Sequence, residues 1–195
     1  MTPLTLLSVA RMARRSAPSA GTATRRTANA PTIRTANPDD APAIDQLIAS
    51  HHAEGRLLLR QRDEIAAHAH RFVVADRDGE VVACAELAPL SRRVAEVRSL
   101  VVRGDARGGN VGCRLVEELM RQGSAAGFES VCAFTHTPGY FVRLGFSIVP
   151  HAWVPEKVAT DCLRCDQFRS CGQHAVRYAL ARPGSPSAAP MALHV

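Results

Sequence analysis

The chain has 195 residues, enough for one domain with a sizeable core and short tails. Its formal net charge of +6 comes from residues 1–35, which hold six arginines and no acidic residue. The other 18 basic residues balance 18 acidic ones. The main part of the chain therefore has no charge bias towards nucleic acid, and no partner of that class is expected.

Residues 1–30 form a leader that is rich in Arg, Ser, Thr and Ala. This composition is typical of an organelle transit peptide, and its apolar patch is too short to span a membrane. A disordered tail and a start codon assigned too early are the alternatives. Lys157 is the only lysine of the chain, and this preference for arginine indicates a GC-rich, bacterial coding sequence. A cytoplasmic location without membrane contact is therefore expected.

Local start signals follow the leader. Thr32–Arg34 predicts a short strand, and Asn37 predicts a helix start because asparagine caps helices and Pro38-Asp39-Asp40 suits a first turn. A second helical piece is predicted near Asp63–His70. Four histidines in this region are interpreted as surface residues rather than ligands: His51, His52, His68 and His70.

A β-hairpin is predicted next. The apolar runs Phe72–Asp76 and Val81–Leu87 flank Arg77-Asp78-Gly79-Glu80, and Asp-Gly is a strong two-residue turn signal.

A strand, a glycine-rich turn and a helix occupy Ala95–Gly127. Ala95–Val102 has the Val and Leu density of a strand, and apolar residues recur at helical spacing from Val111 onwards, with Gly127 as the predicted end. Between them, Arg107-Gly108-Gly109-Asn110-Val111-Gly112 supplies small or left-handed-tolerant residues at a helix N-terminus. Free backbone N–H groups there predict a phosphate cradle.

The remaining elements complete a mixed α/β pattern. Ser130–Phe134 predicts a strand, Pro138–Leu144 a short helix, and Gly145-Phe146 the beginning of a final strand. The order predicts one twisted sheet with helices around it.

The cradle narrows the class of protein. A Walker loop needs Lys followed by Ser or Thr where Cys113-Arg114 stands, and the glycine spacing does not fit a dinucleotide fingerprint. A turn that binds nothing is a further alternative. The cradle resembles the pyrophosphate loop of the GNAT acetyltransferase superfamily, R/Q-x-x-G-x-G/A, with Asn110 where glycine is usual. Pro138–Phe146 resembles a second motif of this superfamily. The resemblance implies an α/β fold: a single GNAT-type domain with a mixed twisted sheet flanked by helices.

A closer resemblance covers residues 31–181. Segments including A-E-V-R-S-L-V-V, F-V-R-L-G-F and D-C-L-R-C-D-Q-F-R-S-C are similar to the short bacterial N-acetylglutamate synthases. This implies an acetyltransferase domain at 31–182, followed by a flexible tail at 183–195. It also implies acetyl transfer from acetyl-CoA to the α-amine of L-glutamate, the first step of arginine biosynthesis. Acetylation of another amine and a non-catalytic module that senses acetyl-CoA or an amino acid are the alternatives, and a homodimer remains open.

The resemblance also implies where the coenzyme lies. The strand is expected to splay from its neighbour at Leu100, Val101 and Val102, whose backbone would bind the pantetheine arm, with an N–H near Val101 polarising the acetyl carbonyl. The pyrophosphate would bind Arg107, Gly108, Gly109, Asn110, Val111 and Gly112.

Two residues are the catalytic candidates. Glu96 is expected to act as general base, directly or through water, and the alternative is a solvated or arginine-paired charge. Phe141 stands where the superfamily often has the tyrosine that protonates the leaving thiolate. Tyr140 is the second candidate, as the donor of that proton, and His136 and water are the alternatives.

Arg98 and Arg60 are expected to hold the two glutamate carboxylates, because an arginine fork binds a carboxylate through two hydrogen bonds. Glu96 and Arg98 are expected on one face of the strand, with Val97 and Val101 on the other. The alternative is that the arginines pair with acids such as Glu86 or Asp63.

The six cysteines fall into two groups. Three of them sit singly in apolar patterns and are interpreted as small buried hydrophobic residues: Cys84, Cys113 and Cys132. The other three, with His174, have the composition of a zinc site but not its usual spacing: Cys162, Cys165 and Cys171. We expect no metal there and a compact loop with free thiols, with zinc or a redox role as the alternative.

Overall fold

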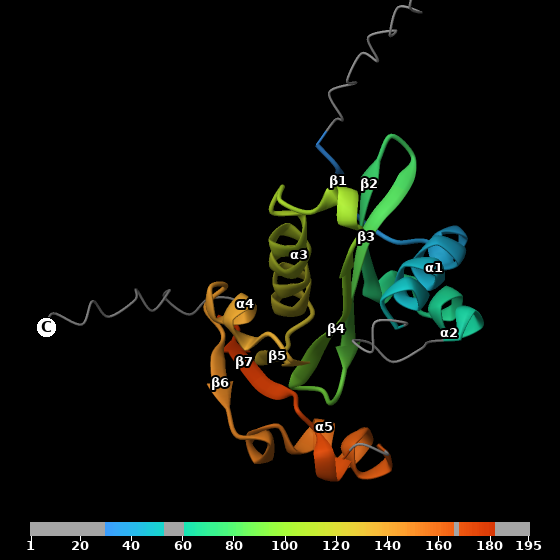
Figure 1. Cartoon of the computed structure of the whole chain (residues 1–195). Coiled ribbons are helices and arrows are strands. Elements are labelled where there is room, and N and C mark those ends of the chain that lie inside the picture. Colours follow the sequence, from blue (N-terminus) through green and yellow to red (C-terminus); the bar gives the residue numbers. More distant parts are fainter. Residues whose placement is uncertain (1–29, 53–60, 166–167, 182–195) are drawn as a thin grey trace, which may run out of the picture.

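A computed structural model describes residues 30–52, 61–165 and 168–181. Within them lies one seven-stranded sheet with helices on both faces (Figure 1). The strands, in chain order, are β1 Thr32–Thr35, β2 Phe72–Arg77, β3 Glu80–Pro89, β4 Val94–Val102, β5 Ser130–Thr135, β6 Ser147–Val149 and β7 His174–Ala179. Their spatial order is β1-β2-β3-β4-β5-β7-β6, and only the β4–β5 pair is parallel.

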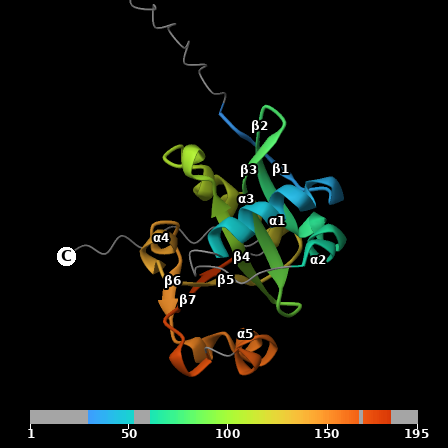
Figure 2. The same cartoon turned by 45° about the vertical axis from the view of Figure 1, so that its right-hand side comes forward.

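The longer helices lie on opposite faces of the sheet. Figures 1 and 2 show α3 on one side of β3 and β4, with α1 and α2 on the other. The helices are α1 Ala41–His52, α2 Arg62–Ala67, α3 Val111–Ala125, α4 Pro138–Val142 and α5 Pro155–Thr160. Short 3-10 turns precede or follow several of them, at Pro38–Asp40, Ala69–Arg71, Gly104–Ala106, His151–Trp153, Cys162–Arg164 and Phe168–Ser170.

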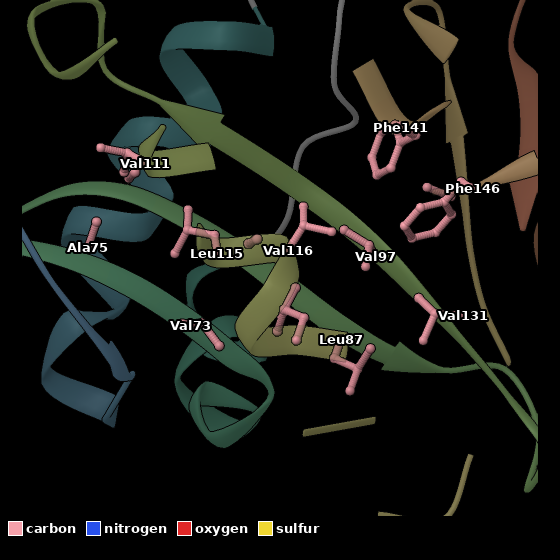
Figure 3. Close-up of a cluster of buried hydrophobic side chains, with 14 of the residues drawn as sticks. Val73, Ala75, Leu87, Val97, Val111, Leu115, Val116, Val131, Phe141 and Phe146 are labelled. Carbon is pink, nitrogen blue, oxygen red and sulfur yellow. The ribbon is translucent and has the colours of Figure 1, made fainter. Parts of the chain in front are cut away.

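Alternation along the strands divides the core into two main layers. Val73 of β2 belongs to the cluster beneath α3, whereas its neighbour Val74 belongs to the cluster beneath α1. In Figure 3 the fully buried Leu115 and Val116 of α3 lie among side chains of the sheet. Burial of such side chains is worth about 1.5–3 kcal/mol each, so these layers hold the helices against the sheet.

The local signals of the sequence are confirmed. Asn37 caps the first turn: its Oδ1 accepts from Asp39 N–H at 2.8 Å, and Asp40 Oδ2 accepts from Asn37 N–H at 2.8 Å. Asp78 and Gly79 take φ of 53° and 84°, as the two-residue hairpin turn requires. Gly127, with φ of 82°, follows Ala126, the C-cap residue of α3.

Two expectations are incomplete or wrong. The predicted order omitted α5 and the final strand β7, which inserts between β5 and β6. Val97 and Val101 do not share a face, because β4 contains a bulge: Ser99 has φ of 53°, and the register shifts between Cys84 and Glu86 of β3. The extra residue turns Val101 towards α1 while Val97 faces α3.

None of the helices in the part of the chain that the structure describes combines the length and the apolar character needed to cross a membrane.

Candidate functional site

The site begins where β4 and β5 separate. Their parallel pairing covers only Val94, Ala95 and Glu96 of β4, with Glu96 opposite Cys132. From Val97 onwards the β4 backbone has no partner on β5 among the described residues, while β5 stays paired with β7 as far as Thr135. The divergence confirms the expected splay and leaves main-chain groups of β4 open to a ligand.

A cavity of about 900 Å³ fills this opening. Its wall combines β4, the cradle turn, the first turn of α3, the end of β5 and α4. Three arginines and two histidines lie in the wall, and no Asp or Glu is among its described residues. The basic side chains are His51, Arg98, Arg107, His136 and Arg143.

The cradle has the backbone that was expected. Gly108 and Asn110 take φ of 89° and 55°, so asparagine replaces the usual glycine in a left-handed conformation that it tolerates. Arg114 N–H donates to Asn110 C=O at 3.0 Å and is the first helical hydrogen bond of α3. The N–H groups ahead of it are those a helix leaves free for an anion. Every predicted coenzyme residue except Gly109 lies in the cavity wall.

Arg107 is held beside the cavity by two contacts. Its Nε donates to Val102 C=O at 3.2 Å, and its Nη2 lies 3.0 Å from His51 Nε2. Because His51 Nδ1 lies 3.2 Å from Leu47 C=O, the tautomer that fits has Nδ1 donating and Nε2 accepting. His51 is partly exposed and lines the cavity wall, where it also contacts Arg107.

Tyr140 reaches the cradle from α4, whereas Phe141 is buried in the core. A Cβ added to Gly112 would lie 2.7 Å from Tyr140 Oη, so the hydroxyl packs against the first turn of α3. This hydroxyl is buried without a hydrogen-bond partner among the described residues. Burial, with a smaller effect of the neighbouring Cys113 thiol, raises the pKa of Tyr140 above its ordinary value. The side chain therefore carries its proton at neutral pH.

Glu96 lies just inside the point of divergence, outside the cavity wall. Its Oε2 accepts from Lys157 Nζ of α5 at 2.8 Å, and that ammonium also donates to Asp161 Oδ2 at 2.6 Å. Burial raises the pKa of Glu96, and Lys157 offsets part of that effect. Lys157 was not predicted as the partner of Glu96, because the two residues lie 61 positions apart in the chain.

Arg98 lies in the wall, but its fork is engaged. Nε and Nη2 donate to the two carboxylate oxygens of Glu86 at 2.7 and 2.9 Å, across the β3–β4 pair. This is the pairing given above as the alternative to carboxylate binding. Nη1 has no hydrogen bond among the described residues and remains available. Arg60 lies outside the residues that the structure describes.

The cysteines largely follow their predicted grouping. Cys84 and Cys132 are buried, and burial raises the pKa of both thiols to about 12, whereas Cys113 is half-buried in the cavity wall. Cys162, Cys165 and Cys171 are free thiols. In the described ranges, no three His, Cys, Asp or Glu side chains gather closely enough to hold a metal.

Sequence comparisons with known proteins point to one family. Residues 38–146 match the model of the acetyltransferase (GNAT) family. An uncharacterized N-acetyltransferase of Chlorobaculum tepidum is 32% identical over 144 residues, covering 74% of this chain and 93% of that protein. The amino-acid acetyltransferase of Pasteurella multocida is 30% identical over 128 residues, which are 65% of this chain but only 29% of that longer protein.

Solved structures show the same fold. N-acetylglutamate synthase from Neisseria gonorrhoeae, complexed with coenzyme A and N-acetyl-glutamate, gives a TM-score of 0.68 at 27% identity, covering 77% of this chain and 35% of that chain. A Mycobacterium tuberculosis protein in complex with CoA gives the same TM-score at 23% identity, covering 77% of this chain and all of its own. With the family model spanning both predicted motifs, the chain belongs to the acetyltransferase (GNAT) family.

Proposed function

We propose that this GNAT N-acetyltransferase moves the acetyl group of acetyl-CoA to the α-amine of L-glutamate. The reaction class and the co-substrate are those of the family. The glutamate substrate, the place in arginine biosynthesis and the cytoplasmic location are our proposals, supported by the N-acetylglutamate synthase neighbour. We place the acetyltransferase domain at residues 31–182, and a homodimer remains a prediction.

The observation that carries the proposal is the charge of the cavity wall, which has three arginines, two histidines and no described acid. Coenzyme A carries phosphates, and glutamate carries two carboxylates. A wall of one sign concentrates ligands of the opposite sign and repels like charges. A polyamine or a lysine side chain would bring positive charge to this wall, so such amines should be poorer substrates.

The coenzyme would lie along the residues expected for it. The pyrophosphate would accept hydrogen bonds from backbone N–H groups of the cradle, Arg107–Gly112, where Gly108 and Asn110 take positive φ. The pantetheine arm would run beside the open β4 backbone at Leu100 and Val102, and the N–H near Val101 would polarise the acetyl carbonyl.

Acetyl transfer needs a neutral amine and a proton for the leaving thiolate. Because Glu96 lies outside the wall, we favour proton transfer from the ammonium to Glu96 through a water molecule. The amine then attacks the thioester carbonyl, its nitrogen releases its second proton to water, and the tetrahedral intermediate collapses with loss of the thiolate. Tyr140 lies in the cavity wall, carries a proton and has no hydrogen-bond partner for its hydroxyl among the described residues, which suits it to protonate that thiolate.

The substrate carboxylates would meet Arg98 and Arg60. Glu86 holds Arg98 by two donors, so Nη1 is the group left for the ligand. A held guanidinium loses little conformational entropy on binding, which favours the remaining hydrogen bond.

A thiol-release assay with acetyl-CoA and single amines tests the proposal. Glutamate should give the highest kcat/KM among amino acids, lysine, polyamines and a peptide N-terminus. Acetyl-CoA binding without release of thiol for any amine would favour a sensing module instead. Faster acetylation of lysine or a peptide would overturn the glutamate assignment.

A further inference from the structure

We propose that Lys157 is a positioning residue, which holds the Glu96 carboxylate in place as an anion so that it can accept the substrate's proton. This inference rests on the proposed function, because it needs Glu96 to be the general base. It concerns the base and not the identity of the amine, so it can be tested with whichever amine is acetylated.

Lys157 reaches the sheet from α5, 61 residues away in the chain. The side chains of Lys157 and Glu96 are 14% and 3% exposed, so their contact is shielded from water, while Asp161 is 43% exposed at the outer end. Nζ lies 5.7 Å from the centre of the Phe134 ring, and Phe134 is part of the cavity wall. Lys157 therefore lies between Asp161, at the exposed end of α5, and the Glu96 carboxylate at the inner end of the cavity.

The contact with Lys157 uses only one of the two carboxylate oxygens of Glu96. Oε2 accepts from Lys157, whereas Oε1 has no hydrogen bond among the described residues. A buried carboxylate without a cation is costly, so it would turn or take up a proton. With one oxygen anchored, the other stays available to a water molecule on the path to the amine.

The other charged groups near Glu96 do not replace Lys157. Arg98 of β4 donates from Nε and Nη2 to Glu86 and lowers the pKa of Glu96 less than Lys157 does, and the thiol of Cys132 on β5 is neutral. Asp161, which follows α5, adds negative charge near the carboxylate. Arg177 of β7 stands opposite Cys132 in the sheet and donates to Ser130 Oγ and Trp153 C=O. Loss of Lys157 would leave two carboxylates, one of them buried, without the cation between them.

The test compares Lys157→Met with Lys157→Arg in the full chain, using kcat at saturating substrates as a function of pH. In the Met variant, the acid limb of the profile should move up by at least about one pH unit, so that kcat at pH values on that limb should fall about tenfold or more. The Arg variant keeps the cation and should restore kcat to within about threefold of wild type. The acetyl-CoA dissociation constant, measured by calorimetry, should change less than about twofold in both variants.

Asp161→Asn is the second variant, useful if Lys157→Met does not fold. Removing this negative charge should leave the acid limb in place or move it slightly down, the opposite direction to Lys157→Met. An upward shift would contradict the proposal. Because Lys157 is the only lysine, ¹³C-lysine labelling gives a single NMR signal of the chain, which Glu96→Gln should shift if the contact exists in solution.

Two outcomes would overturn the proposal. A folded Lys157→Met variant with the wild-type pH profile would show that Glu96 does not depend on the lysine. A variant with an unchanged acid limb but a raised KM for the amine substrate would make Lys157 a substrate-binding residue. Failure of the wild type to acetylate glutamate would count against the proposed substrate and not against this role.

Discussion

At the scale of single residues, the contact between Gly112 and Tyr140 joins the cradle to the candidate acid. A methyl group at position 112 would lie 2.7 Å from Tyr140 Oη and 3.5 Å from Val102 Cγ2, so Gly112→Ala should push the tyrosine into the cavity. We expect acetyl-CoA affinity to fall about tenfold by calorimetry, and Gly112→Glu, which adds a negative charge, to be worse.

Gly139→Ala is the matched control, because nothing lies within 4 Å of the added Cβ in α4. It should bind acetyl-CoA as wild type does. Unchanged affinity in folded Gly112→Glu protein would show that the pyrophosphate does not bind at the cradle.

Arg98 offers a second test at this scale. Arg98→Lys keeps the charge, but a single ammonium cannot hold both oxygens of Glu86 in the same geometry and also face a ligand. We expect the KM for glutamate to rise about tenfold, while the KM for acetyl-CoA stays within about twofold. Arg121→Lys, which alters an exposed two-bond pair with Glu118, should change neither constant. Two unchanged constants in Arg98→Lys would remove Arg98 from the substrate site.

At the scale of elements, the start of α1 depends on Asp40. The hydrogen-bonded Arg34 guanidinium beside it holds the pKa of this carboxyl below its ordinary value. Burial raises this pKa by a smaller amount, and the hydrogen bond from Asn37 N–H lowers it further. Because its pKa is lower in the folded state, Asp40 contributes fully to folding stability above its unfolded-state pKa of about 3.9. This contribution is lost as the pH falls through the folded-state pKa.

Asp40→Asn should therefore lower the free energy of unfolding by about 2 kcal/mol at neutral pH, and the two stability curves should converge in acid. Denaturant titrations across pH measure this. Asp39→Asn, at an exposed position of the same turn, should follow wild type closely. A constant difference between Asp40→Asn and wild type down to low pH would contradict the argument.

The cysteine segment after α5 gives another test for a single element. With no cluster of ligands in the described residues, we predict less than one zinc per purified chain, and a largely intact fold in Cys162→Ser. Elemental analysis and thermal denaturation with and without chelator check both points. One tightly held zinc per chain would instead make the segment a structural metal site.

At the scale of the whole molecule, the sequence predicts what local chemistry determines. The Asn37 cap, the Asp78-Gly79 turn and the cradle each depend on a few adjacent residues, and the structure has all three. The bulge at Ser99 is different, because a serine at positive φ carries no pattern of its own, and it reverses the face of every later β4 residue.

Long-range pairing explains the rest of what the sequence did not predict. Strand β7 pairs with β5, between 39 and 49 residues earlier in the chain, and Lys157 meets Glu96 across 61 residues. No periodicity within either segment carries that information. Glu96 was therefore predictable as a candidate general base, while its ion pair with Lys157 was not.

An internal competition tests the central claim most directly. The full chain would be given limiting ¹³C-acetyl-CoA with all twenty amino acids at equal concentration, and the acetylated products would be quantified by mass spectrometry. Product ratios then give relative kcat/KM values without separate assays. We expect the main product to be glutamate that carries the ¹³C-acetyl group on its α-amine. A mixture dominated by another acetylated amino acid, or by acetyl-lysine, would contradict the proposed function.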